Sequence, residues 1–238
     1  FFKQKTAYEI MPSLVGAEMC IRDRFLNIGR EWGVPLEVLN DGEVTALAGS
    51  MAMGKNGVLG IAMGTSQGGG YIDMNGNITT WLSELAFAPV DMHPNAPADE
   101  WSGDLDCGAQ YFSQQAVGRL LPASGSDYDS TLKLPEQLKI VQALMERGDE
   151  RALKIYDAIG IYLGYSLAHY AEIYDNEYVL LLGRVTTGPG GEHIIERSKE
   201  VMEAEFPDLA KRVKFHIPDE TEKRHGQAIA AASLPRID

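Results

Sequence analysis

The chain has 238 residues, 45% of them hydrophobic, and a formal net charge of −13. This length and composition suffice for one sizeable core, or one and a half domains. The acidic balance argues against non-specific nucleic-acid binding, which depends on basic surface that neutralises phosphates. No apolar run approaches the roughly 20 residues that a membrane span needs, so no membrane partner is expected. Two cysteines, Cys20 and Cys107, are too few for a disulfide scaffold, which favours a reducing cytoplasm.

In the first half of the chain, apolar periodicity predicts helices and strands in alternation from residue 25 onward. In chain order these are a helix end at 25–32, a strand at 36–39, a helix at 41–53 and strands at 57–63, 68–74 and 77–80. Gly33 marks the end of the first helix, and Asn75-Gly76 is a strong signal for a hairpin turn.

The second half begins with a loop rich in Pro, Asp and Gly at 89–106. The elements that follow in chain order are helices at 107–120, 135–147 and 150–174, a strand at 178–182, a helix at 191–205, a strand at 213–217 and a helix at 219–233. The segment 178–182 is wholly apolar, which predicts a strand buried on both faces. The class is therefore α/β, with a mixed sheet whose antiparallel part comes from the hairpin.

Residues 1–24 are predicted to be an unstructured artefact and not part of the native domain, which then covers 25–238. Residues 3–9 match the translation of a flow-cell sequencing adapter, and residues 19–23 match the end sequence left by a transposase library kit. Both matches lie in one reading frame and in the expected order. Pro12 also interrupts any amphipathic helix in this segment.

Two segments carry candidate chemistry: Asp41 between a predicted strand and helix, and the glycine-rich loop at 64–70. Glycines between two strands let backbone N–H groups approach a phosphate without an intervening Cβ. An Asp at the tip of a strand is well placed to act as a general base. Each feature also has a purely structural interpretation, since glycine loops form ordinary turns and Asp residues cap helices.

In this order and at this spacing, the two segments resemble the ROK family of sugar kinases and repressors. Residues 38–48, which include Asn40-Asp41, resemble the family's asparagine–aspartate segment, and residues 64–72 resemble its second phosphate loop. The resemblance runs from about residue 32 to residue 233. It implies the large lobe of an actin/hexokinase-like (ribonuclease H-like) ATPase fold, with the N-terminal lobe missing.

The resemblance also implies roles for individual residues. Asp41 would be the catalytic base that accepts a proton from a sugar hydroxyl attacking Mg-ATP, so that ATP and Mg²⁺ are the expected cofactors. Asn40 would bind the sugar. The residues expected at the nucleotide are Gly64, Thr65, Ser66, Gly68 and Gly183.

Two further residues are candidate sugar ligands by resemblance. Glu84 matches the glutamate of the family's Gly-Glu-x-Gly-His motif, and a surface glutamate is the alternative interpretation. The histidine of that motif is absent, and His93 lies where it could substitute, unless it is a loop histidine without a ligand. His93 and Cys107 cannot complete a four-ligand zinc site, so no metal site is expected.

The function expected from the resemblance is ATP-dependent phosphorylation of a small-molecule sugar, with homodimerisation. The alternative is a sugar-sensing transcriptional regulator of the same family, because glycines and the sugar motif are eroded: Ser66 replaces a loop glycine and one glycine survives at Gly183. A degenerate relative retained for protein contacts is a third possibility. The fragment 25–238 is expected to be inactive, since half of the cleft would be missing. It is also expected to bind no nucleic acid, because the DNA-binding helices of a regulator would lie in the missing upstream region.

Overall fold

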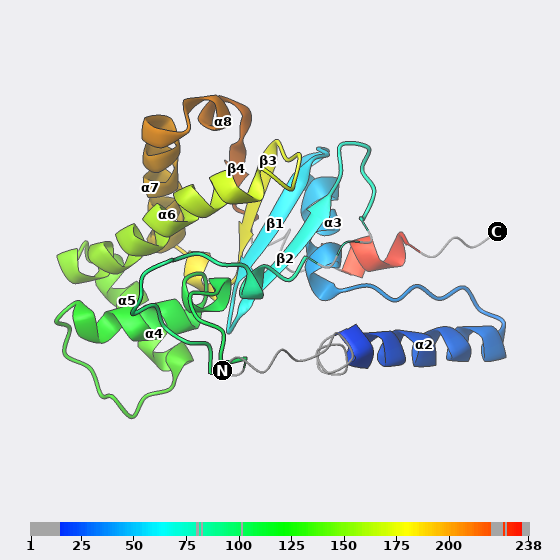
Figure 1. Cartoon of the computed structure of the whole chain (residues 1–238), viewed down its shortest axis with the longest axis horizontal. Coiled ribbons are helices and arrows are strands. Elements are labelled where there is room, and N and C mark those ends of the chain that lie inside the picture. The colour runs from blue at the N-terminus through cyan, green and yellow to red at the C-terminus, as the bar shows by residue number, and fades with distance from the viewer. Residues whose placement is uncertain are drawn as a thin grey trace.

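The computed structural model describes residues 15–79, 81, 83–100, 102–219, 226 and 228–234. Its centre is a four-stranded sheet with the order β2-β1-β3-β4 (Figure 1). The strands are β1 (Val58–Met63), β2 (Gln67–Ile72), β3 (Tyr178–Leu182) and β4 (Lys214–His216). β1 runs antiparallel to β2 and parallel to β3, and β3 runs parallel to β4. The predicted α/β class with a mixed sheet is confirmed.

Seven α-helices have defined bounds in the described part of the chain. They are α2 (Val15–Trp32), α3 (Asp41–Met53), α4 (Gln114–Ala123), α5 (Leu134–Met145), α6 (Glu150–Tyr170), α7 (Pro189–Glu205) and α8 (Pro207–Arg212). The predictions for α3, α5 and α7 agree with these bounds within about two residues. None of the described helices has both the length and the apolar character that crossing a membrane requires.

The helices cover the two faces of the sheet unequally. α6 and α7 lie on one face, where the main core includes Leu59, Ile61 and Met63 of β1 (Figure 1). α3 covers the other face, where Val58 and Leu180 belong to a smaller cluster. Successive residues of a strand point to opposite faces, so β1 and β3 carry no polar side chain at the positions that face either cluster. This confirms the prediction that 178–182 is buried on both faces.

Two predicted strands are absent from the described structure. Residues 36–39 have no regular structure, because no described segment pairs with them. Residues 77–79 contribute only an isolated bridge between Ile78 and Ile72, and residue 80 lies outside the described residues. The turn between them does form, with Gly76 at φ 84° and the Asp73 carbonyl accepting from the Gly76 N–H at 3.0 Å. Both segments have the alternating pattern of a strand, but a strand also needs a neighbour to pair with, and the prediction did not take this into account.

The predicted helix at 107–120 is also wrong in its first half. The chain forms the one-turn helix η2 (Gly108–Gln110) and then restarts as α4. Ser113 caps α4, since its Oγ accepts from the Gln115 N–H at 3.0 Å, and Gly108 donates to the Ala88 carbonyl across the loop. Ser at an N-cap competes with continuation of the helix, which is the physical reason for the break.

The ends of the chain give two further corrections. α2 begins at Val15, so the prediction of no structure is wrong for residues 15–24, which contain no proline. Residues 1–14, which include Pro12, lie outside the described residues. The predicted last helix is seen at 228–232, while 220–225 and 227 are outside the description. α8 was not predicted; Pro207, at its first turn, starts a new helix after Phe206.

Candidate functional site

The loop between β1 and β2 is a tight hairpin of three residues. Met63 and Gln67 form the last pair of the ladder. Within the loop the Gly64 N–H donates to the Ser66 carbonyl at 2.9 Å, and the Gly64 carbonyl accepts from the Gln114 N–H of α4 at 2.9 Å. Thr65 and Ser66 are exposed. The backbone of the loop is thus fixed from inside and from α4, while its tip faces outward.

The N-terminus of α3 lies against β2, the strand that follows this loop, and lines the same pocket as the loop. Asn40 is the N-cap, and its Oδ1 accepts from the Gly42 N–H at 2.8 Å. Asp41 is the first helical residue and is exposed, and its backbone carbonyl accepts from Thr45 Oγ1 at 2.7 Å. A helix N-terminus carries partial positive charge, which favours a carboxylate there and also attracts anionic ligands.

Glycines explain how α3 comes so close to the sheet. A Cβ on Gly70 of β2 would lie 2.2 Å from the Gly42 carbonyl oxygen, and a Cβ on Gly49 would lie 2.2 Å from Leu180 Cδ2. A side chain on Gly70 would push the backbone of α3 away from β2, and a side chain on Gly49 would displace the buried Leu180 side chain. Small residues on both surfaces therefore let α3 lie close against the sheet, so that Asp41 and the hairpin loop line one pocket.

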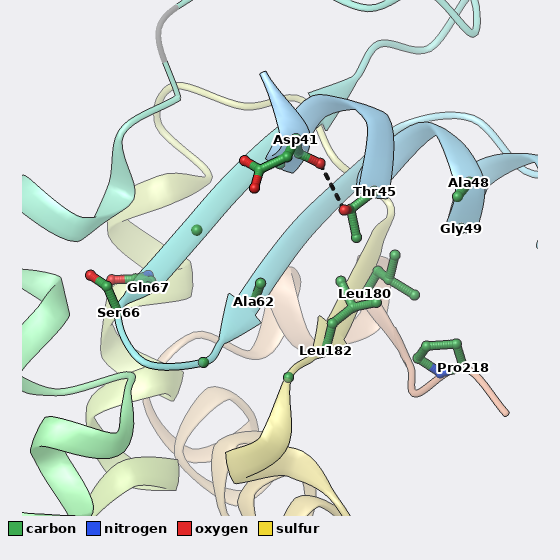
Figure 2. Close-up of a pocket in the computed structure, with 14 residues that line it drawn as sticks. Asp41, Thr45, Ala48, Gly49, Ala62, Ser66, Gln67, Leu180, Leu182 and Pro218 are labelled. Carbon is green, nitrogen blue, oxygen red and sulfur yellow. Dashed lines mark hydrogen bonds between the residues drawn. The ribbon is translucent and has the colours of Figure 1, made fainter. Parts of the chain in front are cut away.

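A pocket of about 490 Å³ lies between α3, the hairpin loop and the end of β3 (Figure 2). This volume lies within the range of small-molecule sites. Figure 2 shows Asp41 and Thr45 on the helix side, Ser66 and Gln67 at the loop, and Leu182 on β3. The fourteen lining residues are Asp41, Gly42, Thr45, Ala48, Gly49, Ala62, Gly64, Ser66, Gln67, Gly68, Leu180, Leu182, Gly183 and Pro218. Asp41 is the one charged side chain among these fourteen.

Nothing in the described chain requires glycine at two positions of the pocket, Gly64 and Gly68. A Cβ on Gly64 would meet only the Ser66 carbonyl oxygen, at 3.6 Å, and a Cβ on Gly68 only Ala62 Cβ, also at 3.6 Å. Both distances are ordinary van der Waals contacts, and neither glycine has a positive φ. Because neither residue has a side chain, space is left on the pocket side of the backbone. This space suits a phosphate, which is bulky and binds close to backbone N–H groups.

Five of the predicted site residues come together around this pocket. They are Asp41, Gly64, Ser66, Gly68 and Gly183. Asn40 and Thr65 are chain neighbours of lining residues but are not in the lining themselves. The roles predicted for all seven stay predictions, because what the structure gives is their placement.

Glu84 and His93 lie outside the lining residues of the pocket. Glu84 is partly buried directly before the one-turn helix η1 (Leu85–Phe87). His93 sits in the loop 89–106, where its Nδ1 accepts from the Asn95 N–H at 3.1 Å. That loop is anchored by Asp91, whose Oδ2 accepts from the hydroxyls of Tyr111 at 2.8 Å and Tyr162 at 3.1 Å.

Several lining residues were missed by sequence reasoning, chiefly Gly42, Thr45, Ala48 and Gly49 of α3. Their signal is a run of small residues spaced three to four apart along one helix face, which marks close approach of the backbone. Leu180 and Leu182 were recognised as strand residues, but an apolar strand gives no sign that its end borders a pocket.

No three His, Cys, Asp or Glu side chains in the described part of the chain gather where they could hold a metal ion. Cys107 is buried and unpaired, and burial raises the pKa of its thiol. A protonated, buried thiol of this kind behaves as a small apolar side chain.

A second, smaller pocket of about 110 Å³ lies where residues 187–190 lead into α7. Tyr156 contributes to its wall and is fully buried, and its hydroxyl has no hydrogen-bond partner among the described residues. Burial raises the pKa of this hydroxyl. A Cβ on Gly190 would lie 2.4 Å from Tyr156 Cζ, so the tyrosine depends on that glycine.

Comparison with known proteins places these features in context. Over 202 residues the chain is 28% identical to a glucokinase of Halalkalibacterium halodurans, an alignment that covers 79% of this chain and 60% of the glucokinase. A ROK family glucokinase from Streptomyces griseus, solved with glucose and AMPPNP, superposes with a TM-score of 0.66 at 18% identity. That superposition covers 89% of this chain and 72% of the glucokinase. The resemblance to the ROK family is confirmed.

A ROK family transcriptional regulator, a homologue of the E. coli MLC protein, has the same fold. It superposes with a TM-score of 0.67 at 21% identity, over 88% of this chain and 55% of the regulator. No family model matches the chain. The chain thus has the ROK-type fold and spans 60% of the length of its curated glucokinase relative.

Proposed function

We propose that this chain forms the nucleotide- and sugar-binding lobe of an ATP-dependent sugar kinase. The observation that carries the proposal is Asp41, which opens α3 in a pocket faced by the glycine positions 64 and 68. The sequence identity with a glucokinase supports the same reaction. The glucose and AMPPNP bound by the Streptomyces griseus relative are the two ligand classes that the proposal requires.

The hairpin loop suits the phosphates of ATP by its space more than by its charge. The Gly64 N–H is already used by the Ser66 carbonyl, so Gly64 contributes room, while the exposed hydroxyls of Thr65 and Ser66 are donors within the loop. The described lining residues offer no cation to the triphosphate. Mg²⁺ would supply that charge. This ion commonly binds through substrate phosphates and waters with only one or two carboxylates, which fits a site whose described residues form no acidic cluster.

In the proposed reaction Asp41 accepts the proton of a sugar hydroxyl. The hydroxyl oxygen forms a bond to the γ-phosphorus while the bond from that phosphorus to the β–γ bridging oxygen breaks, releasing ADP. Asn40 uses its Oδ1 to cap α3, so its amide NH₂ group is the part that donates to the sugar. In this proposal the nucleoside extends along the turn at Gly183 toward the smaller pocket, which Thr187 and Gly188 help to line.

The test is Asp41→Asn in the complete reading frame that encodes this chain. Loss of the base should lower sugar-dependent ATP turnover by about 100-fold or more, since general base catalysis contributes roughly 10²–10⁴-fold. Asp208→Asn is the matched control, because Asp208 also lies in the exposed first turn of a helix but is remote from the pocket. Unchanged turnover in the Asp41 variant would refute the assignment.

The second candidate function is a sugar-sensing regulator, favoured by the equal structural likeness to the MLC homologue. A regulator binds sugar without consuming ATP. Sugar binding by calorimetry, together with no ATP turnover in the complete protein, would therefore move the proposal to this alternative.

A further inference from the structure

Gln67 is a buried polar residue in a position that the proposed reaction does not use. It begins β2, lines the pocket and is 5% exposed. A buried amide that lacks hydrogen-bond partners costs about 1–3 kcal/mol, so its partners are informative.

Those partners are two backbone carbonyls from distant segments. The amide orientation that satisfies its hydrogen bonds places Nε2 3.1 Å from the Leu85 carbonyl oxygen and 3.2 Å from the Gly108 carbonyl oxygen. The opposite orientation would set the amide oxygen against both carbonyl oxygens, so that neither group could donate. One NH₂ group therefore joins β2, η1 and η2; Gln67, Leu85 and Gly108 are called the Gln67 clamp below.

Gly108 shows that the clamp is built into the packing. A Cβ on Gly108 would lie 2.0 Å from the end of the Gln67 amide and 2.3 Å from the Leu85 carbonyl oxygen. Gly108 has no positive φ, so backbone conformation does not require glycine there. The absence of a side chain is needed for the approach of the amide itself.

The clamp connects the phosphate side of the pocket to the segment of Glu84. Glu84 directly precedes η1, which contains Leu85. On the other side, η2 leads into α4, whose Gln114 N–H holds the Gly64 carbonyl. The hairpin loop is therefore tied at Gly64 through α4 and at Gln67 through the clamp, and both ties lead to the η1–η2 region.

We propose that Gln67 is a positioning residue that couples occupation of the hairpin loop to the η1 segment that carries Glu84. This inference rests on the proposed function, because the ligand on the loop is a nucleotide phosphate. A ligand that fixes residues 64–68 restrains the start of β2. Since one amide bonds both carbonyls, that restraint is transmitted to η1 and η2 together.

The test is hydrogen–deuterium exchange of this chain with and without AMPPNP, in the wild type and in Gln67→Met. The reporters are the amides of Phe87, Ala88 and Gly108, which donate to Glu84, Leu85 and Ala88 carbonyls. We expect AMPPNP to slow them at least threefold in the wild type and not in Gln67→Met, while Gly64 is protected in both. Equal slowing in both proteins would overturn the proposal.

Gln137→Met is the matched control. Gln137 is also buried, at 9% exposure, and its amide donates to a backbone carbonyl, that of Leu132, at 2.7 Å. This variant loses a comparable hydrogen bond but should keep the effect of AMPPNP on the reporters. Loss of the effect in Gln137→Met as well would mean that general loosening, and not the clamp, explains the result.

Gln67→Glu separates failure of the clamp from failure of the proposed function. A carboxylate facing two carbonyls cannot donate, whereas a protonated carboxyl donates one hydrogen bond. The loss of thermal stability in Gln67→Glu, relative to the wild type, should therefore become smaller as the pH falls from 8 to 5. The loss in Gln67→Met should be the same at both pH values. A constant loss in Gln67→Glu would refute the clamp. Absence of AMPPNP binding to the wild type would refute the nucleotide role of the loop and the coupling with it.

Discussion

Gly183 lies directly against the backbone of Met63. A Cβ on Gly183 would lie 2.3 Å from the Met63 carbonyl oxygen, and the φ of Gly183 is 95°. The contact brings the end of β3 to the end of β1, where the hairpin loop begins. The chain itself therefore requires glycine at 183, in contrast to Gly64 and Gly68, whose side-chain space is open toward the pocket.

Gly183→Ala should destabilise the fold strongly. A positive φ disfavours alanine, and the added Cβ overlaps main-chain atoms that cannot move away as a flexible side chain can; overpacking alone costs roughly 1–3 kcal/mol. Urea unfolding should show a lower midpoint and a free energy of unfolding reduced by about 2 kcal/mol or more. A change within about 0.5 kcal/mol would contradict the close contact with Met63.

Gly68→Ala should leave the stability of the fold almost unchanged but weaken nucleotide binding. The new methyl group would make only an ordinary contact with Ala62, so the free energy of unfolding should stay within about 1 kcal/mol of the wild type. The same methyl group would enter the space assigned to phosphate, and AMPPNP affinity measured by calorimetry should fall at least tenfold. Unchanged affinity would show that the ligand does not approach the loop at this position.

These two glycines illustrate what the sequence can and cannot predict. A glycine-rich loop between two strands was visible as a pattern, and Asp41 was correctly placed at the start of a helix. The sequence did not show why glycine occurs at positions 68 and 183, because the reason at each position depends on which part of the backbone lies opposite its Cα. The small face of α3, with Gly49 against Leu180, is a contact between segments more than 100 residues apart.

Two tyrosines offer a matched test of hydrogen-bond satisfaction. The Tyr111 hydroxyl donates to Asp91 at 2.8 Å, whereas the Tyr156 hydroxyl is buried without a partner among the described residues. Tyr111→Phe should lower the free energy of unfolding by about 1–3 kcal/mol, since the partner is charged, and Tyr156→Phe should be neutral or stabilising. Equal losses in both variants would contradict the different environments.

The Asp91 anchor should also make the loop 89–106 sensitive to acid. Desolvation acts to raise the pKa of Asp91, but hydrogen bonds from Tyr111, the His93 N–H and Tyr162 outweigh it, and the pKa is lowered. A lowered folded-state pKa gives stability that is present above the unfolded value near 4 and is lost as pH falls through the folded value.

The measurement is thermal unfolding of wild type and Asp91→Asn between pH 7 and pH 3. The wild type should be the more stable at pH 7, and the difference should narrow below about pH 4 as Asp91 becomes protonated. A difference that grows as pH falls would contradict the assigned direction of the pKa.

The errors of sequence interpretation share one physical cause. Residues 36–39 and 77–80 have strand-like patterns, but the described chain offers the first no partner strand and the second only one bridge. The break before α4 depends on Ser113 and on the tie between Gly108 and Ala88, which is a tertiary contact. Local patterns predicted elements with their own periodicity well and failed where a distant segment decides the conformation.

A crystal structure of this chain with AMPPNP and glucose would test the proposed site most directly. We expect phosphate oxygens in the space beside Gly64 and Gly68, with a glucose hydroxyl within hydrogen-bond distance of the Asp41 carboxylate. A nucleotide bound elsewhere, or glucose bound with the loop empty, would refute the proposed kinase site.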